Sequence, residues 1–456
     1  MTVPVQGRPD PAGLLAELRW RGLLQDHTPG LAARLADGRQ IAAYNGFDPS
    51  GASLHVGHLV PVFGLLHVQR HGGRPVVVIG GATGMIGDPS GRSAERNLLD
   101  RQQVVANTTG LAAQLGRFLD FTPGPHAAEI VDNHDWLGEI RMLDFLRDVG
   151  KHFTIPYMLA KDSVRNRLDG GLTFTEFSYM LLQAADFLHL YRTRGVELQT
   201  GGADQWGNIT AGLELIRRVE GAGAADAEGG GEGSAGGAAG GSSGSAEPAH
   251  ALSYPLLLGS NGQKFGKTAE GTAVWLDPTR TSPYAFYQYW LDADDAEATR
   301  LIRLFTLFDR AAIEALEAEA AGAPERRLVQ RALATDLTAR VHGADVAARV
   351  EEVSLAVFSR QLPTLGPEAL AFAFEQLPHA VVRAADLTAG PIGLTVAAGL
   401  FASNGEARRA IGQGGVSVNE ERLSGPDAPL PAAIAGGYLV LRSGKRTYRI
   451  VRVDPD

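Results

Sequence analysis

The sequence predicts an α/β protein with a doubly wound parallel sheet, followed by a helical domain and a small α+β domain. Residues 41–44 form an apolar run, and residues 74–79 begin with Arg74 and continue as a run rich in β-branched residues, as in strands buried inside parallel sheets. Each run leads into a glycine-containing loop and then a helical pattern, which is the βαβ rhythm. Ligands of such sheets bind at the carboxyl ends of the strands, so we expect the functional site there.

The length and amino-acid composition of the chain indicate how many domains it has and exclude some kinds of site. A chain of 456 residues is too long for one core, so we expect two or three domains. It has no cysteine, which excludes disulfides and thiolate metal sites, and no apolar span reaches about 18 residues. We therefore expect a soluble, cytoplasmic protein. The net charge of −9 argues against a uniformly basic surface for nucleic acid but allows a local basic patch.

The first segments predict a helix, a strand and a second helix. Residues 10–40 have a helical pattern of leucines, and the strand at 41–44 delivers a loop that runs to residue 58. The apolar run 59–68 predicts a buried helix, with Pro61 in its first turn, where the missing N–H costs nothing.

Two histidines at the start of that helix are candidate phosphate ligands. His55 and His58 lie three residues apart and share one face with the free N–H groups and the positive dipole end. Gly57 between them would let a flat or charged ligand approach the backbone. Two histidines that only cap and pack a helix are the alternative. A zinc site is disfavoured, since the chain has no cysteine and the nearby carboxylates lie in a turn.

The glycine-rich loop at 80–91 follows the second strand but lacks the G-x-G-x-x-G spacing of a dinucleotide site. It indicates either a ligand close to the backbone or a tight crossover. A helix from residue 97 to about 119 and a strand at 129–132 are predicted next.

A buried helix at 173–191 carries a polar stripe. Tyr179, Gln183 and Asp186 recur at helical spacing on one face of an otherwise apolar segment. Buried polar groups need partners, so this stripe is either an internal network or a substrate contact. Residues 197–208 then predict a short strand, a Gly-Gly turn and a helix start, with Asp204 as a candidate N-cap.

A flexible, solvated insertion is predicted at 221–249, which is Gly/Ala/Ser with a few acids. A strand at 254–258 leads to a glycine loop containing Lys264 and Lys267. The chain has only five lysines against 37 arginines, so this pair indicates a need for ammonium charges, with a plain solvated loop as the alternative. A P-loop is excluded because position 261 is Asn rather than Gly.

The C-terminal third separates into helices, a linker and a small domain. Residues 283–358 have a helical pattern, whereas 360–392 hold few charges and several Pro and Gly. Within the tail at 393–456 we expect a capped helix at 403–411, a strand at 416–419 and a closing hairpin. Residues 401–456 contain eight Lys/Arg against six Asp/Glu, which favours RNA backbone as a partner.

Five stretches resemble one family in the right order. Residues 44–58, with His-Val-Gly-His, resemble the first signature of class I aminoacyl-tRNA synthetases, and 264–268 resemble their lysine-rich second signature. Residues 81–91 and 201–208 are similar to the bacterial tyrosyl-tRNA synthetase family, and the tail is similar to its S4-type RNA-binding domain. The resemblance implies a Rossmann-like catalytic domain at 1–290, a helical tRNA-contacting domain at 291–358, a linker at 359–392 and an S4-like domain at 393–456.

The resemblance also implies a role for each matching residue. Tyr44 and Asp186 correspond to the pair that forms hydrogen bonds with the tyrosine phenol. The other tyrosine-binding positions would be Asp88, Tyr179, Gln183 and Gln199. Positions near ATP would be Gly46, Asp48, Gly57, Gly202, Asp204, Gln205 and Lys267. The catalytic positions would be His55, His58, Lys264, Lys267 and Thr268, and the RNA-binding ones Arg408 and Arg409. Arg92 and Arg96 match basic positions of the family only loosely.

The activity implied is a tyrosine–tRNA ligase that adenylates L-tyrosine with ATP and transfers it to the terminal adenosine of tRNA(Tyr). The resemblance implies a homodimer, Mg²⁺ entering with ATP, no metal cage of protein ligands, no tightly held cofactor and no membrane. The insertion is expected to be passive. Tryptophanyl-tRNA synthetase is one alternative, although an indole would not call for Tyr44 and Asp186. A non-catalytic RNA-binding relative is another, but its signature loops would be broken. A third, another adenylyl-transferring enzyme with the same His-x-Gly-His loop, would not explain the RNA-binding tail.

Overall fold

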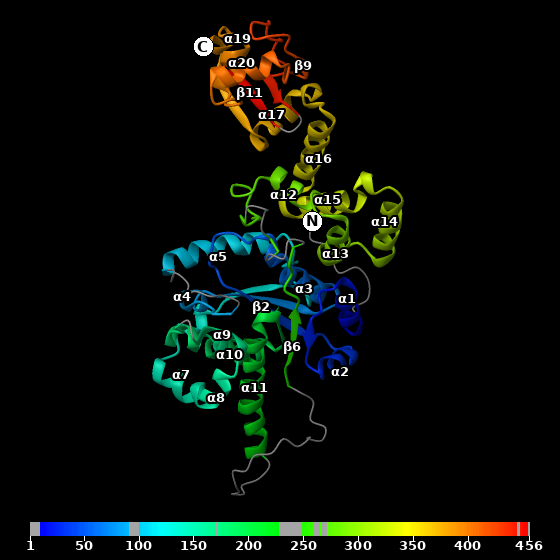
Figure 1. The fold of residues 1–456 in the computed structure, drawn as a ribbon. Coiled ribbons are helices and arrows are strands. Elements are labelled where there is room, and N and C mark those ends of the chain that lie inside the picture. Colours follow the sequence, from blue (N-terminus) through cyan, green and yellow to red (C-terminus); the bar gives the residue numbers. More distant parts are fainter. Residues whose placement is uncertain are drawn as a thin grey trace. The chain divides into compact units, whose positions relative to one another are not determined.

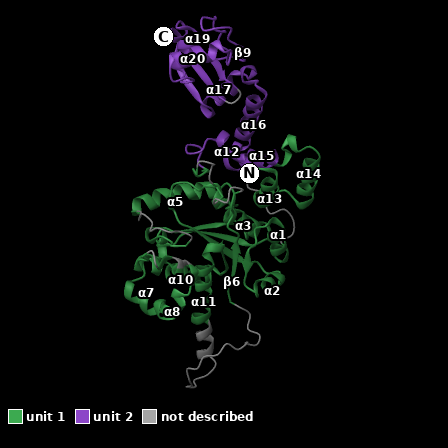
Figure 2. Ribbon diagram, in the orientation of Figure 1, with its two compact units in different colours: residues 1–276, 294–329 green, residues 277–293, 330–456 purple. Residues whose placement is uncertain are grey.

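The computed structural model describes residues 10–90, 100–168, 171–227, 248–259, 265–266, 271–444 and 447–454. The chain forms two compact units (Figure 2). Unit 1 comprises residues 1–276 and 294–329, and unit 2 comprises 277–293 and 330–456. These boundaries cut the predicted helical domain in two, because 294–329 packs with the catalytic fold.

A six-stranded sheet forms the centre of unit 1 (Figure 1). Its strand order is β1-β6-β5-β2-β3-β4. All neighbouring strands are parallel except β1, which is antiparallel to β6. The order reverses at β2, which lies between β3 and β5, so the crevice of a doubly wound sheet opens there. The strands are β1 (Asp26–His27), β2 (Ala42–Phe47), β3 (Arg74–Ile79), β4 (Glu129–Asp132), β5 (Val196–Gly202) and β6 (His250–Tyr254).

Helices cover both faces of this sheet, which confirms the predicted fold class. Helix α3 (Leu59–Arg70) and helix α5 (Arg101–Leu115) lie on one side, and α10 (Phe174–Arg194) and α11 (Trp206–Ala227) on the other (Figure 1). On the α10 side, alternate strand residues such as Tyr44, Val76 and Val78 enter a core with Phe187. The short helices are α1 (Leu14–Arg21), α2 (Leu31–Ala36), α4 (Thr83–Ile86), α6 (His134–Leu137), α7 (Met142–Asp148), α8 (Ile155–Leu159) and α9 (Asp162–Leu168).

Three predicted boundaries in unit 1 are wrong. Residues 10–40 form two helices with β1 between them, not one long helix. The strand predicted at 254–258 ends at Tyr254, because Pro255 has no N–H to donate to the ladder. Helix α11 continues to Ala227, into the predicted insertion, whose residues 228–247 lie outside the described part.

Unit 1 also contains a helical segment formed by α13 (Asp295–Phe305) and α14 (Arg310–Gly322). Arg21 of α1 contacts its first helix: the buried Arg21 guanidinium donates to the carbonyl oxygens of Arg303, Thr306 and Phe308 at 2.9, 2.8 and 2.7 Å. These carbonyls lie at the C-terminal end of α13, where helical partners are missing. Arg21 therefore ties the end of α13 to the first helix of the chain.

Unit 2 combines helices with a five-stranded sheet in the order β7-β11-β10-β8-β9. The predicted hairpin is present as β10 and β11, and the predicted capped helix is present as α20, where Ser403 accepts from the N–H of Glu406. Its helices are α12 (Pro283–Leu291), α15 (Leu328–His342), which starts in unit 1, α16 (Ala344–Ser359), α17 (Pro367–Gln376), α18 (Ala384–Leu387), α19 (Gly390–Ala397) and α20 (Asn404–Gly412). Its strands are β7 (His379–Arg383), β8 (Val416–Val418), β9 (Glu421–Arg422), β10 (Tyr438–Ser443) and β11 (Thr447–Asp454).

The predicted linker at 359–392 is wrong. It contains α17 and β7, and residues 379–383 pair in parallel with 450–454 of β11. Leu370, Ala373 and Val382 are buried, so the low charge of this segment reflects core positions rather than a flexible connection. In the described part of the chain, no helix is long and apolar enough to cross a membrane.

Candidate active site

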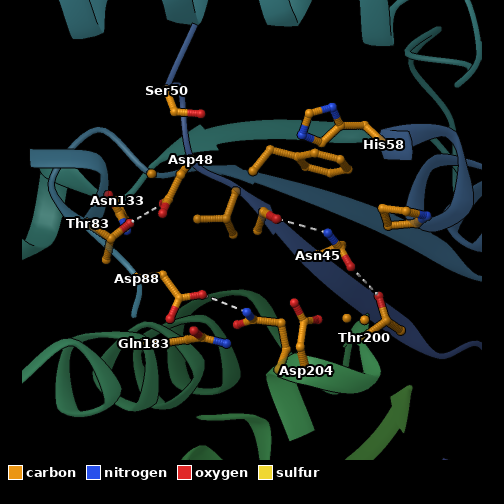
Figure 3. Close-up of a pocket in the computed structure, with 18 of the residues that line it drawn as sticks. Asn45, Asp48, Ser50, His58, Thr83, Asp88, Asn133, Gln183, Thr200 and Asp204 are labelled. Carbon is orange, nitrogen blue, oxygen red and sulfur yellow. Dashed lines mark hydrogen bonds between the residues drawn. The ribbon is translucent and has the colours of Figure 1, made fainter. Parts of the chain in front are cut away.

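A cavity of about 520 Å³ lies in unit 1 at the carboxyl ends of β2, β3 and β5 (Figure 3). This is the crevice at which the strand order reverses. The predicted site residues that line it are Tyr44, Gly46, Asp48, His55, His58, Asp88, Tyr179, Gln183, Asp186, Gly202, Asp204 and Gln205. The polar stripe of α10 is therefore both an internal network and part of the cavity wall.

Tyr44 and Asp186 place a phenol and a carboxylate in a fully buried part of this wall. Within the described residues, the Tyr44 hydroxyl has no hydrogen-bond partner. The Asp186 carboxylate accepts from Asn133 Nδ2 at 2.9 Å and from Trp136 Nε1 at 2.7 Å. Each donor bonds to a different carboxylate oxygen, so Asn133 and Trp136 together fix the orientation of the Asp186 carboxylate.

Burial dominates the titration of this pair. It raises the pKa of Asp186 to about 8, against the lowering effect of the hydrogen bonds from Asn133 and Trp136. Burial and the neighbouring Asp186 also raise the pKa of Tyr44 well above its usual value. The site therefore holds a phenol as a donor beside a carboxyl group that ionises with difficulty.

A chain of hydrogen bonds joins Asp186 to Asp48, which also lines the cavity. Asn133 Nδ2 also donates to Thr83 Oγ1 at 3.0 Å, and Thr83 Oγ1 donates to Asp48 Oδ1 at 2.9 Å. Tyr179 Oη donates to the other oxygen, Oδ2, of Asp48 at 3.1 Å. The sequence predictions group Tyr179 with Asp88, whereas the structure bonds it to Asp48.

A second network surrounds Asp88. Its Oδ2 accepts from Gln205 Nε2 at 2.6 Å, and its Oδ1 accepts from the N–H of Ser90 at 3.0 Å. Asn208 Nδ2 lies 3.4 Å from Asp88 Oδ1 and 3.2 Å from Gln183 Oε1. Asn208 thus links α10, the start of α11 and the glycine loop.

The two predicted histidines form a capping box on the 3-10 turn Val56–His58 that precedes α3. His55 Nδ1 accepts from the N–H of Gly57 at 3.0 Å, and His58 Nδ1 accepts from the N–H of His55 at 3.1 Å. Because both Nδ1 atoms accept, the neutral rings carry their proton on Nε2. Both histidines line the cavity, so they cap the helix and also form part of the cavity wall.

Gly57 and Gln199 are not among the described residues that line the cavity. A Cβ at Gly57 would lie 2.8 Å from His55 Cε1, so the lack of a side chain at Gly57 makes room for the folded-back imidazole. Gln199 of β5 is buried and lies beside Gly212 of α11. Gly46 does line the cavity, and a Cβ there would meet no atom within 4 Å.

Other predicted residues fall elsewhere. Lys264, Lys267, Thr268, Arg92 and Arg96 lie outside the described residues. Asp204 is not an N-cap, since it lies inside a 3-10 turn whose cap is Gly202. In unit 2, the adjacent Arg408 and Arg409 are exposed on α20.

Sequence reasoning missed Asn133, Trp136, Thr83 and Asn208. Asn133 is the first residue after β4, so the rule that ligand groups follow the carboxyl ends of parallel strands could have identified it. Trp136 and Asn208 carry no comparable signal, because nothing in their local pattern shows which carboxylate they will meet.

Two family models match the chain. The model for class I tRNA synthetases (W and Y) matches residues 36–359, and the model for the C-terminal domain of tyrosine–tRNA ligases matches residues 370–451. The second match begins inside the segment predicted as linker, in agreement with the structure.

Named relatives agree with these models. A tyrosine–tRNA ligase of Anaeromyxobacter dehalogenans is 48% identical over 444 residues, covering 96% of this chain and 99% of the relative. One of Geobacillus stearothermophilus is 42% identical over 442 residues, covering 96% of this chain and 99% of its own. The structure of a C-terminally truncated mitochondrial tyrosyl-tRNA synthetase of Coccidioides posadasii matches with a TM-score of 0.63 and 28% identity, covering 74% of this chain and 91% of that one.

Proposed function

Because this chain belongs to the tyrosine–tRNA ligases of the class I tRNA synthetase family, we propose a role for each part of its cavity in the reaction of that family. The enzyme uses ATP to join L-tyrosine to its tRNA. Tryptophan is not favoured as the amino acid, since the C-terminal model is that of tyrosine–tRNA ligases.

Tyr44 and Asp186 are proposed to read the phenol of the substrate. The Tyr44 hydroxyl would donate to the phenol oxygen, and the phenol would donate to Asp186. Phenylalanine would leave the buried Tyr44 hydroxyl without a partner and would offer Asp186 no donor beyond Asn133 and Trp136. Tyrosine against phenylalanine is itself the standard example of such rejection. The observation that carries this role is the unpartnered Tyr44 hydroxyl beside a carboxylate held by Asn133 and Trp136.

The substrate ammonium is proposed to bind Asp88, Tyr179 and Gln183, which line the cavity together with the phenol-reading pair and the histidine turn. The network through Gln205 and Asn208 supports this role because it orients the Asp88 carboxylate. Gly46, Asp48, Gly202, Asp204 and Gln205 would then contact the ATP side of the adenylate.

His55 and His58 are proposed to stabilise the α-phosphate as it is attacked. A carboxylate oxygen of tyrosine forms a bond to the α-phosphorus, and the bond to the bridging oxygen of pyrophosphate breaks. The Nε2–H groups suit the charge that develops there, and the sequence adds Lys264, Lys267 and Thr268 for the leaving pyrophosphate. A hydroxyl of the terminal adenosine then attacks the tyrosyl carbonyl, and AMP leaves.

Mg²⁺ is proposed to enter as part of the ATP substrate complex. Among the described residues, no group of three or more His, Asp or Glu side chains is arranged to hold a metal ion. The lining carboxylates are engaged instead with protein donors, Asp48 with Thr83 and Asp88 with Gln205. Phosphate oxygens and water would therefore supply the metal ligands.

A homodimer is proposed from an apolar surface on α7 to α10. Leu143 is 78% exposed and Phe174 is 72% exposed, and Met142 and Ile155 are also exposed. Exposed apolar surface of this kind marks an interface in a soluble protein. We propose that a second copy of the chain covers this surface.

The cytoplasm, where tRNA is charged, is the proposed compartment. In unit 2, Arg408 and Arg409 are proposed to contact tRNA phosphates.

Amino-acid-dependent pyrophosphate exchange tests the phenol assignment. The enzyme should exchange with tyrosine and show little exchange with phenylalanine or tryptophan. Asp186→Ala should lower kcat/KM for tyrosine far more than it raises KM for ATP. If Asp186→Ala activates tyrosine as well as the unmodified enzyme, the assignment of Asp186 is wrong.

A further inference from the structure

A histidine of α10 stacks on the indole ring that supports Asp186. The ring centroids of His189 and Trp136 are 4.5 Å apart, and the two planes are inclined by only 9°. Trp136 is 8% exposed, whereas His189 is half-buried. The imidazole of His189 therefore covers one face of an almost fully buried indole.

The stack and a hydrogen bond hold this indole at two points. Trp136 Nε1, at the edge of the ring, donates to Asp186 Oδ1 at 2.7 Å. Asp186 and His189 are three residues apart on α10, so they lie on the same face of one helix. Helix α10 thus supplies both the acceptor for the edge of the indole and the ring that fixes its plane.

The segment that carries Trp136 cannot fix the indole by itself. Helix α6 is only four residues long, and a helix this short depends on packing for its stability. A hydrogen bond weakens steeply when its donor angle bends, so rotation of the indole would weaken the bond to Asp186. A flat ring packed against the indole opposes that rotation.

His189 stacks on Trp136 as an uncharged ring. Burial and, after it, the charge of Arg194 lower the pKa of His189 below its usual value. The imidazole is therefore neutral at pH 7 and offers a flat aromatic face without placing a positive charge on the indole.

We propose that His189 is a positioning residue for tyrosine specificity, because it holds the plane of Trp136 so that the indole N–H stays directed at Asp186. His189 is not among the described residues that line the cavity, so it would act only through Trp136. The inference rests on the proposed role of Asp186 in binding the substrate phenol.

Tyrosine-dependent pyrophosphate exchange tests this role with two substitutions. His189→Leu removes the flat ring but keeps apolar bulk, so KM for tyrosine should rise roughly 3- to 10-fold, the size of effect that an aromatic pair gives, with kcat and KM for ATP within about twofold. The preference for tyrosine over phenylalanine in kcat/KM should fall by a similar factor. His189→Phe keeps a flat ring and should bring KM for tyrosine back to within about twofold of the unmodified enzyme.

Tyr191→Leu is the matched control. Tyr191 is a half-buried aromatic residue two positions further along α10, and it packs against the same core cluster as Trp136. Its replacement removes a ring from the same helix but leaves the stack on Trp136 in place, so KM for tyrosine should stay within about twofold. A rise as large as that of His189→Leu would indicate general damage to α10 and would overturn the inference.

A double-mutant cycle shows whether His189 acts through Trp136. Trp136→Phe removes the Nε1 donor, so His189→Leu in that background should change KM for tyrosine less than about twofold. Full additivity, or failure of His189→Phe to restore KM, would overturn the inference. If Asp186→Ala activates tyrosine normally, the proposed phenol-binding role fails and the inference fails with it. If Asp186→Ala loses activity but His189→Leu is unaffected, only the role of His189 is refuted.

Discussion

Hydrogen bonds from neighbouring groups fix the orientation of individual side chains in the cavity, whereas the local sequence around each side chain does not. Asp186 has one donor on each carboxylate oxygen, and the two histidines each accept at Nδ1. Such arrangements fix which atoms remain for a ligand. The chemistry of the site is therefore decided by residues that a ligand need not touch.

The raised pKa of Asp186 predicts a pH effect on stability. Its pKa is about 8 in the folded protein against about 4 when unfolded, so between these values only the folded state keeps the proton. The contribution is greatest below pH about 4 and is lost as pH rises to about 8, by up to about 1.4 kcal/mol per pH unit. Asp186→Asn cannot titrate. The free energy of unfolding of the unmodified protein, minus that of Asp186→Asn, should fall between pH 5 and 8 in urea denaturation; a flat difference would contradict this.

Removal of one supporting donor should weaken tyrosine binding. Asn133→Ala takes a hydrogen bond from Asp186 and another from Thr83. Leaving a buried acceptor without one of its donors costs about 1–3 kcal/mol, so KM for tyrosine should rise roughly 5- to 100-fold, with a smaller rise for ATP. Steady-state exchange kinetics measure both. Trp136→Phe, which removes the other donor, should act in the same direction, and unchanged KM values in both variants would refute the supporting role.

Among residues, the sequence was most informative where the chemistry repeats along one element. Tyr179, Gln183 and Asp186 could be predicted together because helical spacing places them on one face. Gly57 was predicted to let a ligand approach the backbone, and the structure adds a second reason for glycine there, since the His55 ring lies where a Cβ would crowd it. Contacts such as Asp186 with Trp136 depend on tertiary packing and have no local signal.

Helix α10, which carries three cavity residues, is anchored at its first turn by a buried ion pair. Arg167 of α9 donates to Glu176 at 2.9 Å, and the two side chains are 5% and 4% exposed. Glu176 is also the third residue of a capping box with Thr173. The start of α10 therefore depends on a charge from the neighbouring helix.

Breaking this pair on one side should be costly. Arg167→Met leaves the Glu176 carboxylate buried without its cation, which costs about 3–5 kcal/mol. Adding Glu176→Gln should recover much of that loss, because no charge is then buried alone. Arg165→Met is the control on the same helix: Arg165 pairs with Asp162 at an exposed position, and its loss should cost less than about 1 kcal/mol. Denaturant titrations compare the three; equal losses for Arg165→Met and Arg167→Met would contradict the expectation.

Elements with strong local patterns were predictable, and those defined by distant pairing were not. The strand at 129–132, α10 and the β10–β11 hairpin follow from apolar runs and turns. Strand β7 was missed because its partner, β11, lies about 70 residues further along the chain and most of its own residues are not buried. A short edge strand of this kind gains its structure from pairing rather than from its own pattern.

On the scale of the whole molecule, the apolar surface of α7 to α10 predicts self-association. Leu143→Asp and Phe174→Asp should each shift the protein from dimer to monomer, because a carboxylate would be buried at the interface. Sedimentation equilibrium measures the mass. Phe358→Asp is the control, since Phe358 is 89% exposed in unit 2 and should leave the mass unchanged. Dimers that persist in both variants would place the interface elsewhere.

The continuous path from Asp186 through Asn133 and Thr83 to Asp48 has a consequence for engineering. A library that recodes the pocket floor to accept a non-natural amino acid would change the acceptor on which Asn133 is oriented. Thr83 and Asp48, the second of which is proposed to contact ATP, would then lose their fixed geometry. Selections that vary Asp186 alone should therefore yield slow enzymes, and compensating changes at positions 83 and 133 should restore their speed.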